Sequence, residues 1–164
     1  MRKNPTVLAV DLGGTNMRSA LVSSSGEVLA RLSVPTEATK GPEAAMDRLA
    51  TALSQLREAV PDAEAVALGM ALAGPLDPGT GTLHHPPNLP GWDGFSAQTY
   101  LAERVGIPIR SHNDATLAAL GEHAYGVGRG KSSLVFVAWG TGVGGGLVLN
   151  GQLYDGVRGF AAEI

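Results

Sequence analysis

The sequence predicts an α/β fold, on three observations. Short apolar runs closed by glycines alternate with amphipathic stretches through the middle of the chain. Three strand-like runs joined by tight turns open the chain, and three more close it. Glycines and prolines cluster at the turns between apolar segments rather than in one low-complexity tract, as in a folded protein with functional loops.

The first third of the chain predicts a three-stranded meander and a helix. Residues 6–14, TVLAVDLGG, are an apolar run that ends in a charge and two glycines, typical of a buried strand before a tight turn. Residues 17–35 contain two further strands around a Ser-Ser-Gly turn. Gly41-Pro42 then starts a helix with an apolar stripe, and Pro61 ends it.

The later elements follow from the same signals. We expect a strand at 65–74, a turn-rich loop from Gly74 to Gly94, a helix from about Ser96 to Val105, a strand from Ile107 to Arg110, a helix from about Asp114 to Ala124, and a final strand, glycine loop, strand, Asn150-Gly151 turn and strand. The two ends of the chain, 6–30 and 133–156, therefore repeat one pattern of three strands with a Gly/Thr turn, which indicates two similar lobes.

Composition excludes several classes of protein. The formal net charge of −3 comes with no basic stripe, so we expect no nucleic-acid partner. Apolar runs such as LVFVAW are too short to span a bilayer, so we expect no membrane partner either. The chain contains no cysteine, so it has no disulfide framework or thiolate metal site, which fits a cytoplasmic location.

The glycine loop at 140–145, GTGVGG, matches the G-x-G-x-x-G pattern of dinucleotide sites. A Rossmann site requires a helix to follow, and here an apolar stretch with a hairpin turn follows instead. Two interpretations remain for this loop alone: a β-hairpin whose backbone N–H groups and Thr141 hydroxyl hold phosphate oxygens, or a glycine-rich turn without a ligand.

A second loop at 11–16, DLGGTN, adds a carboxylate to the same design. Asp11 at the end of a buried strand can hold Mg²⁺, directly or through water, while the turn holds phosphate. The alternative is that Asp11 only caps the turn through nearby backbone N–H groups. Taken together, the two loops indicate a nucleotide phosphate chain held between two lobes.

Six segments occur in the order and spacing of one family: VDLGGTN, LAGPLDPGTGTL, PPNLPGW, HNDATLAALGE, GTGVGGGLVLNG and GFAAEI. On these segments the chain resembles the sugar kinases of the ROK family. The resemblance implies the actin/hexokinase-like ATPase fold, with two lobes around a cleft. Residues 1–110 would form the N-terminal lobe, and residues 111–164 the linking catalytic helix and the incomplete start of the second lobe.

The resemblance also implies ATP and Mg²⁺ as cofactors and a hexose, first of all glucose, as substrate. Asp114 corresponds to the family's catalytic base. The sugar-binding positions correspond to Gly74, Asn88, Asn113 and Glu163. The phosphate and Mg²⁺ contacts correspond to Asp11, Gly13, Gly14, Thr15, Thr141 and Gly142, with Asp11 as the Mg²⁺ contact.

The side chains suit this chemistry, because phosphoryl transfer depends on positioning and charge neutralisation. The Asp114 carboxylate can accept the proton as the sugar O6 attacks the γ-phosphorus, and a helix N-terminus stabilises its negative charge. Asn88 and Asn113 offer amide groups that match vicinal hydroxyls. Seen alone, however, Asn113 and Asp114 are also favoured helix caps.

The chain departs from the family pattern at its end. Glu163 normally begins a Glu-x-Gly-His motif, and the zinc motif of the family would lie beyond Ile164, so we expect no zinc ligands in this chain. We therefore expect a shortened and poorly active kinase that self-associates as a homodimer through its uncovered strands. The alternative is a sugar-responsive ROK transcriptional regulator, disfavoured because a DNA-binding segment has no room before Asp11.

Four further residues have plain structural interpretations. Trp92 is expected to fill a core edge rather than border the sugar. His84-His85 is expected to be a solvated loop rather than a metal site, because adjacent residues rarely converge on one ion. His112 is interpreted as incidental to Asp114, because neighbouring side chains in an extended strand point apart.

Overall fold

The computed structural model describes residues 4–140, 142–157 and 159–162. Its strands are β1 (Asn4–Leu12), β2 (Asn16–Ser23), β3 (Val28–Pro35), β4 (Ala63–Leu72), β5 (Leu76–Asp77), β6 (Thr82–Leu83), β7 (Ile109–Asn113), β8 (Leu134–Trp139), β9 (Val143–Leu149) and β10 (Gln152–Leu153). Its α-helices are α1 (Pro42–Ala59), α2 (Ala97–Val105) and α3 (Asp114–Ala124), and a 3₁₀ turn, η1, spans Ala38–Lys40.

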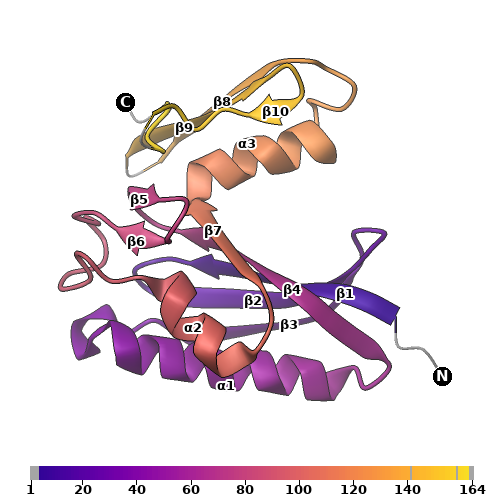
Figure 1. The fold of residues 1–164 in the computed structure, drawn as a ribbon, viewed down its shortest axis with the longest axis vertical. Coiled ribbons are helices and arrows are strands. Elements are labelled where there is room, and N and C mark those ends of the chain that lie inside the picture. The colour runs from indigo at the N-terminus through magenta and orange to yellow at the C-terminus, as the bar shows by residue number, and fades with distance from the viewer. Residues whose placement is uncertain (1–3, 141, 158, 163–164) are drawn as a thin grey trace.

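Two sheets lie at opposite ends of this part of the molecule, with α3 between them (Figure 1). The larger sheet has the order β3-β2-β1-β4-β7, and the smaller has the order β10-β9-β8. In each, three consecutive strands form an antiparallel meander, as the repeated sequence pattern predicts. The turn at Asn150-Gly151 has φ values of 53° and 77°, and positive values at both positions are what a type I′ hairpin requires.

The core of the larger sheet lies on the face that α1 and α2 cover (Figure 1). Since strand side chains alternate between faces, every second residue of β1 and β2 points into this core. The helix α1 begins with Pro42 at its first position and buries an apolar stripe, as predicted. Fully buried members include Leu8, Leu12, Met17, Leu21, Met46, Leu49, Leu53, Leu68, Met70 and Leu72.

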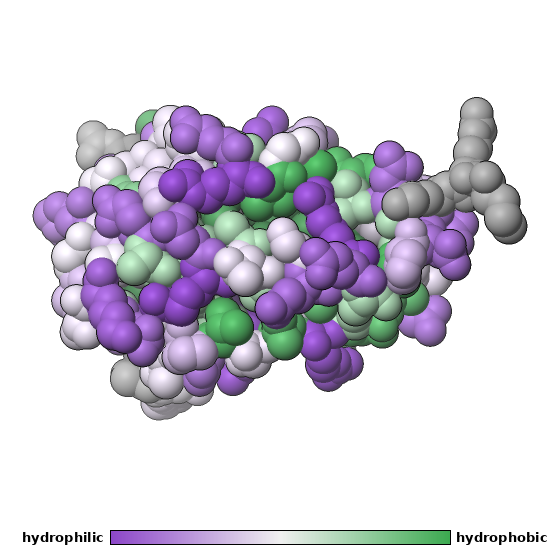
Figure 2. Space-filling view, turned by 90° about the horizontal axis from the view of Figure 1, so that it is seen from below, coloured by the Kyte–Doolittle hydropathy of each residue, from purple (hydrophilic) through white to green (hydrophobic). Residues whose placement is uncertain are grey.

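The outer surface below α1 is mixed in character. Seen from that side, hydrophilic side chains surround a smaller apolar area (Figure 2). Exposed residues of α1 include Glu43, Asp47, Thr51 and Glu58. Within the described residues, no helix is both long and apolar enough to cross a membrane.

Trp92 joins the loop between β6 and α2 to the core, which confirms the structural prediction for it. Its side chain is 0% exposed, and its Nε1–H donates to the carbonyl oxygen of Ala38 at 3.3 Å. The ring of Phe95 meets it edge-on with a centroid distance of 5.9 Å. An indole needs such a partner when it is buried, so this loop is held at a fixed place above the core.

The strand β7 differs from its prediction, because Ile107 to Arg110 was too short and too early a range for it. The strand runs on to Asn113, with Ser111 beside Met70 and Asn113 beside Leu72 of β4. Ser111 is buried, but its N–H and hydroxyl both donate to Oε1 of Gln98, at 3.0 and 2.9 Å. The strand can end in polar residues because their polar groups have hydrogen-bond partners. The periodicity of apolar residues does not indicate such partners, so it underestimates the length of the strand.

The helix α3 packs against β9 at very short range. A Cβ on Gly146 would lie 2.5 Å from Cβ of Ala119 and 2.9 Å from Cα of Thr116. A Cβ on Gly144 would lie 3.3 Å from Cβ of Ala115. Small residues on both elements therefore let the helix and the strand approach closely, and they fix α3 to the smaller sheet.

Replacing Gly146 with valine is expected to lower the free energy of unfolding by about 1–3 kcal/mol or more, because the side chain overpacks the contact between α3 and β9. Chemical denaturation followed by circular dichroism measures the change. Gly121→Ala is the matched control: a Cβ at this position would meet no heavy atom of another element within 4 Å, and alanine in a helix interior gains up to about 1 kcal/mol over glycine. Equal stability of the two variants would contradict the close packing.

Candidate functional site

A cavity of about 640 Å³ lies where the two sheets approach each other around the start of α3. Five of the residues predicted from the sequence line its wall: Gly74, Asn88, Asn113, Asp114 and Gly142. They come from four separate segments, namely the turn after β4, the loop after β6, the start of α3 and the hairpin between β8 and β9. The fold thus brings together side chains that are far apart in the sequence.

The start of α3 divides two tasks between neighbouring residues. Asn113 is the N-cap: its Oδ1 accepts from the N–H groups of Ala115 and Thr116 at 2.9 and 3.2 Å. Its Nδ2 donates to the carbonyl oxygen of Gly74 at 3.3 Å. Asp114 accepts from the Ala115 N–H through Oδ1 at 2.8 Å and is exposed at the cavity wall. The cap and the candidate base are therefore different residues.

This division predicts different outcomes for two substitutions of Asn113. Asn113→Ala is expected to lower the free energy of unfolding by about 1 kcal/mol, because the N-cap is lost. Asn113→Asp is expected to cost less, because aspartate caps helices about as well as asparagine. Both variants lose the donor to Gly74, so only the difference between them in denaturation experiments reports the cap. A larger loss for Asn113→Asp would contradict the assignment.

The loop glycines bring two segments close to each other. A Cβ on Gly14 would lie 2.5 Å from the carbonyl oxygen of Asn88, so the β1–β2 turn packs directly on the loop that carries Asn88. This turn is closed by a hydrogen bond from the Gly13 N–H to the Asn16 carbonyl at 3.0 Å and tied to Thr36, whose N–H donates to the carbonyl of Thr15 at 2.9 Å. The predicted phosphate turn and the predicted sugar loop are neighbours.

Gly74 itself has a conformation suited to glycine. Its φ is 134°, and a Cβ would lie 2.9 Å from Cβ of Pro86. Any larger residue would therefore be strained and would also push the loop at residues 86–88. Gly74 contributes its backbone to the cavity wall, with its carbonyl oxygen engaged by Asn113.

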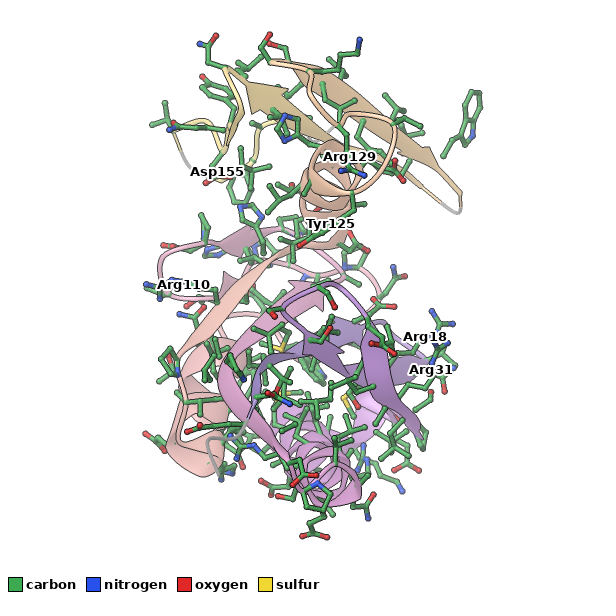
Figure 3. The ribbon with its side chains drawn as sticks, turned by 90° about the vertical axis from the view of Figure 1, so that its right-hand side faces the viewer. Arg18, Arg31, Arg110, Tyr125, Arg129 and Asp155 are labelled. Carbon is green, nitrogen blue, oxygen red and sulfur yellow. The ribbon has the colours of Figure 1, made fainter. Side chains whose placement is uncertain are left out.

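Asp11 lies apart from the residues that line the cavity. Its Oδ2 accepts from Nη1 of Arg18 at 3.3 Å, and both side chains are largely exposed. It lines a second hollow of about 570 Å³ on the sheet face that α1 does not cover, together with Arg18 and Arg31. Figure 3 shows these two arginines on the same side of the sheet. Its assignment to Mg²⁺ stays a prediction.

Two predicted residues, Thr141 and Glu163, lie outside the described residues. Among the residues that are described, no group of three or more histidine, aspartate or glutamate side chains is arranged to hold a metal ion. The described side chains with shifted pKa values do not line the cavity: the hydrogen bond from Lys40 lowers the pKa of Glu37, and desolvation raises the pKa of Tyr100.

Sequence reasoning missed two histidines. His85 lines the cavity, has a φ of 46°, and is held by Asp93 through its backbone N–H at 2.7 Å and its Nδ1 at 3.2 Å. Its place in the same loop as Asn88 is the one sequence signal that could have indicated its place at the cavity. His112 is buried and contacts Asp155, 43 residues later. His112 is bonded to Asp155 and to the Asn113 N–H rather than to Asp114, in agreement with its interpretation as incidental to Asp114, and no local pattern indicates the distant partner.

The chain is similar in sequence to known proteins of one family. The family model described as ROK family matches residues 7–164. A glucokinase of Halalkalibacterium halodurans is 34% identical over 159 residues, which are 96% of this chain and 48% of that protein. An N-acetylmannosamine kinase of Escherichia fergusonii is 35% identical over 97% of this chain and 53% of its own length. The chain thus spans about half the length of the curated relatives it matches.

Solved structures confirm the predicted actin/hexokinase-like fold. A ROK family glucokinase from Streptomyces griseus, in complex with glucose and AMPPNP, superposes with a TM-score of 0.85 at 31% identity, over 96% of this chain and 49% of that one. A ROK hexokinase from Thermus thermophilus gives a TM-score of 0.86 at 34% identity, over 96% and 51%. A ROK family transcriptional regulator gives 0.81 at 20% identity, over 99% and 41%, and shows the fold alone.

Proposed function

Since this chain belongs to the ROK family, we propose that it carries the sugar-binding and proton-accepting part of an ATP-dependent hexose kinase, with glucose as the first candidate substrate. The observation that carries the proposal is the cavity, whose wall joins Asn88, Asn113 and Asp114. Relatives named glucokinase support the choice of glucose, and those named N-acetylmannosamine kinase make that amino sugar the second candidate.

In this proposal the two asparagines orient the sugar. Asn113 is held on both sides, by the backbone N–H groups at the start of α3 and by the Gly74 carbonyl. Its Nδ2 has two hydrogens, and Gly74 uses one of them, so we assign the other to a sugar hydroxyl. Asn88 sits on a loop stiffened by Pro86 and Pro87, so its amide is also presented at a fixed place.

Asp114 then acts as the general base. One carboxylate oxygen is steadied by the Ala115 N–H at 2.8 Å. The carboxylate accepts the proton of the attacking hydroxyl while the oxygen forms its bond to the γ-phosphorus of ATP. Because the carboxylate stands at the start of α3, its negative charge is stabilised by the helix N-terminus.

The glycine turns supply the proposed phosphate site. Gly14, between Gly13 and Thr15 in the β1–β2 turn, lies beside Asn88, and Gly142 lines the cavity from the opposite hairpin. The complex of the Streptomyces griseus glucokinase with AMPPNP supports ATP as the phosphoryl donor. Mg²⁺ would neutralise phosphate charge when bound, but Asp11 is paired with Arg18 and lies off the cavity wall, so no step here depends on the metal.

The length of the chain relative to its relatives decides how this function is tested. We propose that residues 1–110 form one lobe and 111–164 begin the second, in a cytoplasmic homodimer. Since the chain spans about half the length of its relatives, hexose binding and turnover are measured separately.

Hexose binding is the direct test. Glucose, mannose, fructose and N-acetylmannosamine are titrated into the ¹⁵N-labelled chain, and turnover with ATP and Mg²⁺ is followed by coupled release of ADP. We expect glucose to shift the amide signals of Gly74, Asn88 and Ala115 saturably. Asn88→Ala should remove the shifts, whereas Asn4→Ala, at an exposed strand end, should leave them. Absence of saturable shifts with every hexose would refute the proposal.

A further inference from the structure

His112 uses both nitrogens of its ring in the interior of the molecule. Its side chain is only 10% exposed. Nδ1 accepts from the N–H of Asn113 at 2.9 Å, and Nε2 lies 2.8 Å from Oδ1 of Asp155. Because Nδ1 is an acceptor, the neutral ring carries its hydrogen on Nε2 and donates it to the Asp155 carboxylate. The ring thus connects the end of β7 with the loop that follows β10.

Asp155 lies in the loop that follows β10, where the smaller sheet approaches the rest of the molecule (Figure 3). Its carbonyl oxygen accepts from the Ala161 N–H at 3.1 Å, which closes the loop on itself. The Tyr154 N–H donates to the Leu147 carbonyl at 2.9 Å, which ties the start of the loop to β9. The loop is therefore a closed unit anchored on the smaller sheet.

The same loop rests on the first half of the chain at two more points. A Cβ on Gly159 would lie 2.5 Å from Cδ of Pro78, next to β5. The ring of Phe160 meets His84 edge-on with centroids 6.2 Å apart. These two contacts are apolar or close-packed, so the partly buried His112–Asp155 hydrogen bond is the directional contact among the three.

We propose that His112 and Asp155 form a positioning pair that seats the loop after β10 on the end of β7 and thereby holds the hexose site in its binding geometry. The ring bonds directly to the backbone of Asn113, whose side chain caps α3 and binds Gly74. The effect on hexose rests on the proposed function; the seating of the loop does not.

Four substitutions separate the two bonds of the ring. His112→Gln places an amide N–H near the position of Nε2 and so keeps the donor to Asp155. His112→Asn keeps an acceptor near the position of Nδ1, but its side chain is too short to reach Asp155. Asp155→Asn keeps an acceptor oxygen, and Asp155→Ala removes it. Asp47→Ala is the matched control, because it removes a carboxylate bound to Arg104 at 2.9 Å on the far side of the molecule.

The first measurement concerns the loop and needs no hexose. The ¹⁵N spectrum of the imidazole should show the Nε2–H form of His112. Asp155→Ala and His112→Asn should each speed exchange of the Ala161 amide about tenfold or more, as loss of a charge-assisted bond predicts. The double variant should match either single one, because both remove the same contact. His112→Gln and Asp47→Ala should stay near the original rate.

The second measurement concerns the sugar. In a glucose titration, Asp155→Ala and His112→Asn should each weaken binding about tenfold, and His112→Gln should bind glucose with nearly the original affinity. In a form of the protein that phosphorylates hexose, the first two substitutions should raise KM for the hexose and change kcat little. The proposed pair would be refuted by any of three results. These are unchanged exchange of the Ala161 amide, additive effects in the double variant, and a loosened loop with unchanged glucose affinity. If the original chain binds no hexose, the proposed function fails. Exchange of the Ala161 amide and the imidazole spectrum of His112 still test whether the pair holds the loop on β7.

Discussion

Replacing Asp114 with asparagine is expected to lower kcat for hexose phosphorylation by about 10²–10⁴-fold, the usual contribution of a positioned general base. The amide cannot accept the proton of the sugar hydroxyl. The fold should persist, because Oδ1 of asparagine can still accept from the Ala115 N–H, as Asp114 does at 2.8 Å. Hexose affinity should change little, since Asn88 and Asn113 remain in place.

The measurement combines a coupled ADP assay with glucose titration. The assay uses the shortest form of the protein that shows hexose-dependent turnover, and the titration and thermal unfolding use the 164-residue chain. Asp62→Asn, which makes the same chemical change at an exposed turn, controls for a general effect of lost charge. If Asp114→Asn kept the kcat of the control, Asp114 would not be the base.

Replacing Trp92 with alanine is expected to lower the free energy of unfolding by about 3–5 kcal/mol, the cost of removing a fully buried large aromatic side chain. The side chain is 0% exposed and is packed edge-on against Phe95. The substitution also leaves the carbonyl oxygen of Ala38 without its donor. Because the loop that carries Asn88 is anchored here, hexose affinity should fall as well.

Urea denaturation followed by circular dichroism measures this change, since the chain has only two tryptophans and their fluorescence would change with the substitution. Trp139→Ala is the matched control: this side chain is 89% exposed at the end of β8, so its loss should stay within about 0.5 kcal/mol. A loss of stability for Trp92→Ala no larger than for Trp139→Ala would show that the loop is not anchored by the core.

Local patterns predicted most of the elements, because their signals are contained in a few neighbouring residues. Pro42 at a helix start and the positive φ values of Asn150-Gly151 are properties of the short segment itself. The bounds of α3 followed in the same way from polar residues in front of an apolar run. The family motifs then indicated which residues meet, and the cavity wall contains five of them, three polar residues and two glycines.

Other features depend on distant partners and left no local trace. The strand β7 continues through Ser111 only because Gln98 satisfies its polar groups. His112 obtains its role from Asp155, which lies 43 residues later in the chain. Asp11 turns to Arg18, its direct cross-strand partner in β2, and no turn motif indicates that orientation. Such contacts follow from sheet register and loop closure, which short windows of sequence do not determine.

The close packing of Gly146 on α3 has a mechanical consequence. The helix moves with the smaller sheet, because Ala119 and Thr116 leave no space between them. Yet α3 begins directly where β7 ends, with no intervening residue between Asn113 and Asp114. A rotation between the two sheets would therefore pivot at this junction. The carboxylate of Asp114 would lie close to the axis, where a hinge displaces atoms least.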